Sequence, residues 1–228
     1  MEQKLKVTNA LSDPTRFNIY QHIIEQMEAV TVNDIAETFD IHPNVARMHL
    51  SKLEDVDLII SYTKKTGKGG RPSRLYELSN HVIELNFPHR DYKLLSAIAL
   101  ETLSKLGKPG EKALFDTGFT YGQRMIDQYQ DASKLSLEQK LKLLRDASKL
   151  LGMYADFHYS ETDQSITYTI NNCPFKEAAT KNESICHMHE FFLKGMFESL
   201  FEGITLSETN NMLNGCKNCT YIAKLSVV

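Results

Sequence analysis

Four cysteines, all in the last quarter of the chain, are the residues with the most evident capacity for chemistry. Their spacing is Cys173-x12-Cys186-x29-Cys216-x2-Cys219. The last two are close enough to reach one metal ion from a tight turn, and Gly215 suits such a turn. Four thiolates can hold either tetrahedral zinc or an iron–sulfur cluster. The pattern therefore favours a metal centre over four cysteines that serve only as small buried apolar residues.

The surroundings of two of these cysteines support that interpretation. Cys173 precedes Pro174 at the end of a predicted strand, and Cys186 lies near the start of a predicted helix, where the helix dipole favours a thiolate. His187 and His189 are close enough in sequence to serve as substitute ligands. We rank them below the cysteines, because a histidine on an apolar helix is more often part of the core.

A second chemical feature is a basic segment from Thr63 to Tyr76. It contains no acidic residue and five cationic ones, which are Lys64, Lys65, Lys68, Arg71 and Arg74. The net charge of the chain, −3, does not by itself indicate nucleic-acid binding. A local basic stripe next to a suitable helix does indicate it, because cationic side chains neutralise phosphates regardless of the overall charge.

A suitable helix precedes the basic segment, over residues 43–55. Its predicted inward residues are apolar: Ala46, Leu50 and Leu53. Its predicted outward residues are polar: Asn44, Arg47, Ser51 and Lys52. Arg can contact guanine and Asn can contact adenine in the major groove, whereas Lys52 is expected to meet phosphate. His49 is expected to be half-buried within the domain rather than to read bases.

The elements that position these residues predict an α+β protein that is mainly α. Predicted helices cover 13–27, 31–39, 43–55, 91–106, 111–130, 136–151, 175–181 and 184–202. Predicted strands cover 58–62, 75–78, 154–160, 166–170, 204–209 and 220–227. Asp13 before Pro14, and Thr31 with Asp34, predict helix starts. The first of these helices is expected to direct Phe17, Tyr20, Ile23 and Ile24 inward.

The first 80 residues resemble a known family. Leu11-Ser12-Asp13-Pro14-Thr15-Arg16 resembles the opening of ArsR-type winged helices. The segments His42–Glu54 and Gly70–Tyr76 resemble the recognition helix and wing of the Suf-regulator-like branch. The resemblance covers about residues 8–80. It implies a homodimer that reads a palindromic operator, commonly as a repressor. Asp57 departs from the pattern, because glycine is usual at that position.

The C-terminal half carries a further resemblance. Asn172-Cys173-Pro174-Phe175, then Cys186, a helix with Gly195, and finally Cys219 resemble the C-terminal half of Suf-regulator-like proteins. That half is similar to the domain named after vinyl reductases. The resemblance implies a [4Fe-4S] cluster on Cys173, Cys186 and Cys219. Cys216 departs from the usual pattern, and an extra thiolate would either complete a cluster or favour Zn2+, so both metals stay open.

These features predict three regions. Residues 1–88 form a winged helix-turn-helix DNA-binding domain, 89–150 a helical linker and dimerisation region, and 151–228 a cysteine-containing sensor domain. The expected protein is a cytoplasmic repressor of transcription that binds double-stranded DNA as a homodimer, with no secretion signal and no membrane segment. An alternative keeps the DNA-binding half but has the sensor bind an organic effector, with zinc in a structural role. An enzyme is not expected, because no Ser-His-Asp arrangement, phosphate loop or dinucleotide fingerprint is present.

Overall fold

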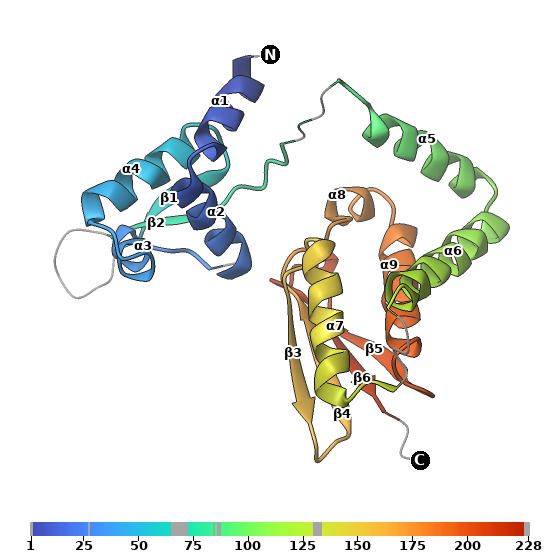
Figure 1. Ribbon diagram of the computed structural model, residues 1–228. Coiled ribbons are helices and arrows are strands. Elements are labelled where there is room, and N and C mark those ends of the chain that lie inside the picture. Colours follow the sequence, from blue (N-terminus) through green and yellow to red (C-terminus); the bar gives the residue numbers. More distant parts are fainter. Residues whose placement is uncertain are drawn as a thin grey trace. The chain divides into compact units, whose positions relative to one another are not determined.

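The computed structural model describes residues 2–26, 28–64, 73–83, 85, 88–129 and 134–225. The chain forms two compact units, Met1–Arg90 and Asp91–Val228, each with its own hydrophobic core (Figure 1). Both units combine helices with antiparallel strands, which confirms the predicted α+β class. Each unit is described by itself.

Among its described residues, the first unit has four helices followed by a two-stranded hairpin. In chain order its elements are α1 (Glu2–Leu11), α2 (Pro14–Gln26), α3 (Val32–Thr38), α4 (Pro43–Glu54), β1 (Ile59–Lys64) and β2 (Ser73–Leu78). The two strands pair antiparallel, from Ile59 opposite Leu78 to Lys64 opposite Ser73. Val30 adds a short bridge to Tyr76, with backbone hydrogen bonds of 2.8 Å in both directions. The hairpin is therefore attached to the segment between α2 and α3.

The predicted helix starts are confirmed by their capping bonds. The Asp13 side chain accepts a hydrogen bond from the backbone N–H of Arg16 at 2.9 Å. Thr31 and Asp34 form a reciprocal capping box at the start of α3. These bonds satisfy N–H groups that have no partner within the helix, which explains why short polar residues mark both starts.

The predicted inward face of α2 is confirmed for Ile23, which is buried, and for Tyr20, which packs against the core, but it was wrong for Phe17. Phe17 is 40% exposed, whereas Ile19 and Ile23 are buried in the core of the first unit. Residues 17 and 19 lie on nearly opposite sides of a helix with 3.6 residues per turn. The buried stripe follows the pair Ile19 and Ile23, and the larger aromatic side chain is left at the surface.

The second unit packs helices against a four-stranded antiparallel sheet. Its elements are α5 (Tyr92–Lys105), α6 (Lys108–Asp127), α7 (Leu137–Leu150), β3 (Ala155–Ser160), β4 (Ser165–Ile170), α8 (Lys176–Ala179), α9 (Ser184–Glu198), β5 (Thr205–Asn210), the 3-10 turn η2 (Met212–Asn214) and β6 (Cys219–Lys224). The strand order is β3-β4-β6-β5. The turn η2 was not predicted, and α6 begins three residues before its predicted start.

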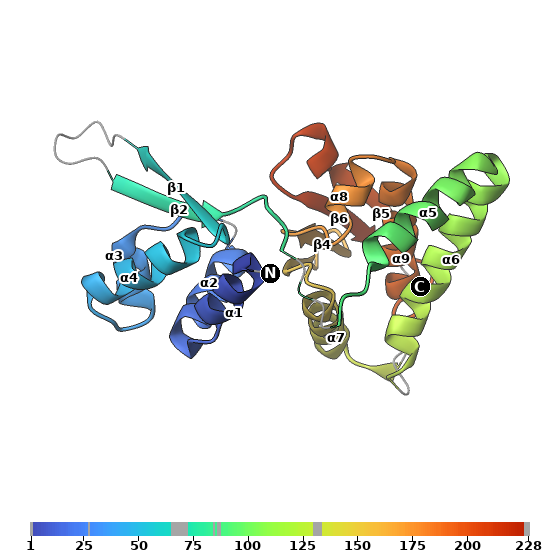
Figure 2. The ribbon, with the colours of Figure 1, turned by 90° about the horizontal axis from the view of Figure 1, so that it is seen from above.

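The packing of α6 along α9 depends on glycine (Figure 2). A Cβ atom added to Gly122 would lie 1.9 Å from the carbonyl oxygen of Phe192, and one added to Gly195 would lie 2.1 Å from that of Phe119. No side chain fits at such distances, so the two helix backbones are in direct contact. The two helices should therefore move together.

The sheet core is aromatic and includes one satisfied polar pair. Tyr168 and Tyr221 are buried on β4 and β6, together with Phe197 from α9. The Tyr168 hydroxyl pairs with Ser148 Oγ of α7 at 2.9 Å, and Ser148 Oγ donates to the carbonyl of Leu144 at 2.6 Å. Buried hydroxyls need such partners, so this network fixes α7 against the sheet.

The helices over 92–150 belong to the same compact unit as the sheet, and α6 shares its packing with α9. The separate regions 89–150 and 151–228 stay a prediction. Among the described residues, each helix is either too short or too polar to traverse a lipid bilayer.

Asp57 adopts a left-handed backbone conformation, with φ of 61°, in the turn between α4 and β1. This conformation costs a non-glycine residue about 1–2 kcal/mol. Glycine would remove that cost while adding about 0.5–1 kcal/mol of unfolded-state entropy. Asp57→Gly is therefore expected to stabilise the protein by up to about 1 kcal/mol in urea denaturation.

The matched control is Asp55→Gly, two residues earlier in the same turn. Asp55 is in the right-handed region, with φ of −58°, so glycine there relieves no strain and should destabilise by about 0.5–1 kcal/mol. Shifts of the same sign for the two variants would contradict the assignment of strain to Asp57.

Candidate nucleic-acid interface and cysteine site

The outward face of α4 presents the polar residues that the sequence predicts. Asn44, Arg47 and Lys52 are exposed, and Ser51 is half-buried. The opposite face is fully buried, through Ala46, Leu50 and Leu53. Arg47 Nη1 donates a hydrogen bond to Asn44 Oδ1 at 3.1 Å, so these two side chains lie together on the exposed surface.

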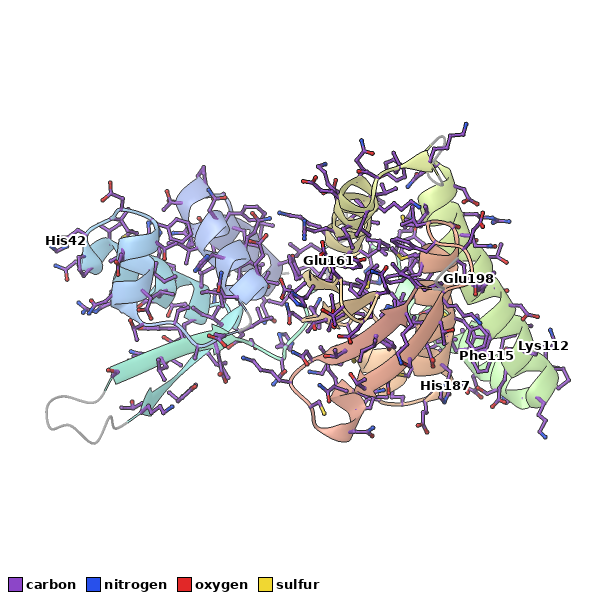
Figure 3. The ribbon with its side chains drawn as sticks, turned by 90° about the horizontal axis from the view of Figure 1, so that it is seen from below. His42, Lys112, Phe115, Glu161, His187 and Glu198 are labelled. Carbon is purple, nitrogen blue, oxygen red and sulfur yellow. The ribbon has the colours of Figure 1, made fainter. Side chains whose placement is uncertain are left out.

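The amino end of α4 is also exposed, and His42 marks it (Figure 3). His42 caps the helix, because its Nδ1 accepts a hydrogen bond from the backbone N–H of Asn44 at 3.2 Å. Pro43 at the first helical position needs no partner for a backbone N–H. The free N-terminal turn of a helix in this position is suited to entering a groove.

His49 packs within the domain, and more deeply than the half-buried position predicted. Its side chain lies on the buried face of α4 and is 4% exposed. Burial lowers the pKa of the imidazole, and the nearby Asp13 carboxylate acts in the opposite direction. The residue therefore belongs to the core of the first unit.

The basic segment is described only in part. Lys64 is exposed at the end of β1. Lys65, Lys68 and Arg71 lie outside the described residues, and their contact with DNA stays a prediction.

Arg74 makes contacts that the sequence did not indicate. Its guanidinium bonds both carboxylate oxygens of Glu54, at 2.9 and 2.7 Å, and its Nε donates to Ser61 Oγ at 2.8 Å. Ser61 in turn donates to Glu54 at 2.6 Å. The group connects the C-terminal end of α4 to both strands of the hairpin, so Arg74 has a bracing role whatever its role toward phosphate.

Three of the four cysteines lie near one another in the second unit. Cys173 follows β4, Cys186 is in the first turn of α9, and Cys219 begins β6, where it pairs with Ile170 at the end of β4. Cys219 and Cys186 both raise the pKa of the Cys173 thiol, which reflects their proximity. We call Cys173, Cys186 and Cys219 the cysteine site. Cys216 is exposed in the loop after η2, and it lies close enough to Cys219 to raise the pKa of the Cys219 thiol.

Each sulfur of the cysteine site has a nitrogen partner. Asn211 Nδ2 donates to Cys186 Sγ at 3.3 Å, and the backbone N–H of Met212 donates to Cys219 Sγ at 3.3 Å. His189 Nδ1 lies 3.7 Å from Cys173 Sγ. The residues that supply these nitrogens were not predicted as sulfur partners, because they follow from the path of η2 and the phase of α9.

Burial and hydrogen bonding act in opposite directions on these thiols. Burial raises the pKa of Cys173 to about 11, and it also raises the pKa values of Cys186 and Cys219. The hydrogen bonds from Asn211 and Met212 lower the pKa values of their respective partners. A bound cation reverses the effect of burial, because it supplies the opposite charge that a buried thiolate lacks.

The two nearby histidines differ in their surroundings. His189 is 3% exposed, and burial lowers its pKa to about 4, so its imidazole is neutral near pH 7. Its Nε2 has no hydrogen-bond partner among the described residues. His187 is exposed instead and lies beside Phe115 of α6, with ring centroids 6.1 Å apart (Figure 3).

The cysteine site offers sulfur donors, which are the ligand type that zinc and iron–sulfur clusters take from proteins. Thiolates around one tetrahedral zinc ion, at about 2.3 Å from it, lie only about 3.8 Å from one another. Among the described residues, no group of three or more His, Cys, Asp or Glu side chains is arranged to hold a metal ion as it stands. A metal centre at these cysteines, whether a cluster or a single ion, therefore stays a prediction.

A comparison with protein families identifies a known type of domain within the first unit. Residues 11–62 match the family described as a helix-turn-helix domain. The matched segment contains α2, α3 and α4 and the start of β1. The chain thus carries a segment that matches a helix-turn-helix domain, and this supports a DNA-binding transcription regulator. The role of α4 as the recognition helix stays a prediction.

The other comparisons are less informative. No curated protein matches the sequence. One solved structure that is similar to this chain is a trafficking protein particle complex subunit 3 from Naegleria fowleri covalently bound to palmitic acid. It is 16% identical to this chain in sequence, with a TM-score of 0.39. The match covers 59% of this chain and 97% of that one. This likeness is too weak to assign a fold or a ligand to the second unit.

Arg47→Ala is expected to reduce operator discrimination, because a guanidinium on the exposed face of the recognition helix can bond guanine in two places. The loss of one such contact corresponds to about 1–3 kcal/mol of discrimination. Gel-shift competition between operator and unrelated DNA measures it. Equal operator preference in variant and wild type would count against Arg47 as a base-reading residue.

The comparison variant is Lys64→Ala with Lys65→Ala. Removal of phosphate contacts should weaken binding to both DNAs alike and reduce its dependence on salt, while the ratio between operator and unrelated DNA stays unchanged.

Proposed function

We propose that the protein is a homodimeric transcriptional repressor that reads a palindromic operator and whose DNA affinity depends on a metal centre at the C-terminal cysteines. A [4Fe-4S] cluster on Cys173, Cys186 and Cys219 is the leading form of this centre. The single observation that carries metal control is the set of three neighbouring sulfurs, each with its own nitrogen partner.

The DNA-reading half of the proposal rests on α4 and the hairpin. One α4 offers the DNA a short exposed face that includes Asn44 and Arg47. One such helix contacts only a few base pairs, and two-fold related copies read two half-sites about one helical turn apart. A dimer is therefore the form in which this face gives useful specificity.

Helix α5 supports the homodimer, because its large apolar side chains are exposed in the described part of the second unit. None of its residues is buried. Five large apolar side chains on the helix and its C-cap are each more than half exposed: Tyr92, Leu94, Leu95, Ile98 and Leu106. A helix this rich in apolar residues is normally buried. A continuous exposed apolar patch of this kind marks an interaction surface.

The other side of α5 is attached to its own unit. Lys93 forms an ion pair with Glu177 at 2.5 Å, and Asn182 donates to Ser104 Oγ at 3.1 Å. We call Tyr92, Leu94, Leu95, Ile98 and Leu106 the apolar stripe of α5. Because Lys93 and Ser104 face α8 and α9, the apolar stripe is directed away from them. A second copy of the same stripe is a suitable partner, because two apolar faces bury one another without leaving a charge unpaired.

The proposed link between metal and DNA runs through helix contacts. Cys186 lies on α9, α9 is in backbone contact with α6 at Gly122 and Gly195, and α5 packs on α6. When bound, the centre supplies cationic metal that holds the three thiolates charged and in fixed positions. A change in the position of α9 is then passed to the dimer surface on α5, which shifts the population of DNA-competent dimers.

Ile98→Glu is expected to convert the dimer to monomers, because it places a charge in the middle of the apolar stripe. Sedimentation velocity measures the change. Ala97→Glu is the matched control, since Ala97 is exposed on the same helix but outside the stripe, and its dimer should persist. Dimers of equal stability in both variants would exclude the stripe as the interface.

Anaerobic purification with metal analysis tests the centre itself. The expected product is brown, contains iron and absorbs at roughly 400 nm, as thiolate-bound iron–sulfur centres do. Cys173→Ser should lose the iron, whereas Cys216→Ser should keep it. A colourless protein that holds zinc supports the alternative function, a winged-helix regulator of an organic effector, and a protein without metal contradicts metal control.

A further inference from the structure

Asn211 holds a fixed place between the cysteine site and an acidic residue. Its Oδ1 accepts a hydrogen bond from the backbone N–H of Leu213 at 2.8 Å, which caps η2. Its Nδ2 donates to Cys186 Sγ at 3.3 Å and to Glu208 Oε2 at 2.9 Å. An amide nitrogen has two hydrogens, so the two donated bonds use its full capacity. The orientation of the amide is thus determined from both ends.

Glu208 is a charge that works against a thiolate. Its carboxylate also accepts a hydrogen bond from the Tyr221 hydroxyl at 3.3 Å. The amide of Asn211 donates to both the carboxylate and the sulfur, so it lies between these two groups. Two neighbouring negative groups in a partly buried site repel one another strongly.

We propose that Asn211 is a positioning residue of the metal centre, which retains metal by shielding the Cys186 thiolate from Glu208. The inference rests on the proposed function, because it assigns a role in a centre that the cysteines hold. Residues that hydrogen-bond to metal ligands typically contribute 10–100-fold to metal affinity. Asn211 is the one side chain among the described residues that bonds both the sulfur and the carboxylate.

The neighbouring donors fit the same role. The next residue, Met212, donates its backbone N–H to Cys219 Sγ, so two consecutive residues serve two of the three sulfurs. His189 Nδ1 lies near the third sulfur, that of Cys173. The start of η2 therefore forms an outer layer over the cysteine site, and Asn211 is the part of it that a side-chain substitution can test.

The test compares three variants of the full-length protein, purified anaerobically with its metal. Asn211→Asp keeps the oxygen that caps η2 but replaces the donor with a negative charge. Asn211→Ser also keeps a capping oxygen and removes the donor without adding charge. Glu208→Gln removes the opposing charge and keeps an oxygen that accepts from Asn211.

The readout is the anaerobic transfer of the protein's metal, iron or zinc as purified, to an excess of a chromogenic chelator. We expect Asn211→Ser to lose metal about 10-fold faster than wild type, Asn211→Asp up to about 100-fold faster, and Glu208→Gln more slowly than wild type. A purely structural network would instead make all three variants lose metal faster.

The outcomes separate the two proposals. If wild-type protein holds no metal, the proposed metal control fails. If wild type holds metal but both Asn211 variants release it at the wild-type rate, or Glu208→Gln releases it faster, the role of Asn211 is overturned while the metal centre stands.

Discussion

The second unit contains a conflict between burial and charge at the sulfurs of Cys173, Cys186 and Cys219. Burial disfavours the thiolate, yet only a thiolate binds metal. Hydrogen bonds to Cys186 and Cys219 partly offset this cost, and a cation would offset the rest. In the proposed metal centre the thiols are neutral without metal and become thiolates when metal binds. That property suits a sensor better than a permanently filled structural site does.

The consequences of filling the site depend on α9 being rigidly joined to its neighbour. Ordinary helix pairs can adjust by rotating side chains, but backbones in contact at Gly122 and Gly195 have no side chains to rotate. A displacement of the amino end of α9, where Cys186 lies, therefore has to move α6 or break the contact. Gly122 and Gly195 allow the two helices to pack closely. In the proposed mechanism they also make the mechanical coupling between α9 and α6 stiff.

Much of the first unit could be predicted from residues that are close in sequence. The predictions failed where the contacts join different helices and strands. Capping residues such as Asp13 and Thr31 act on the next turn of their own helix, so their effect can be predicted from the sequence. The left-handed backbone at Asp57 agrees with the glycine that is usual at that position. Phe17 was misplaced because the phase of a short helix is set by its neighbours. Arg74 was assigned to DNA alone because Glu54, twenty residues away, is not visible as its partner in a local pattern.

The same distinction applies to the cysteine site. The cysteines were found by residue type and spacing, which carry information about chemistry without any knowledge of the fold. Their nitrogen partners give no such information, because asparagine, methionine and histidine are common in loops and cores. Only the path of η2 brings Asn211 to Cys186. The ligands determine which metal can bind, and their hydrogen-bond partners determine how tightly it is held. The sequence alone therefore identifies the class of site, whereas its affinity for metal depends on the fold. It follows that regulators with the same cysteine spacing can differ widely in how readily they lose metal, according to what residue stands at the position of Asn211.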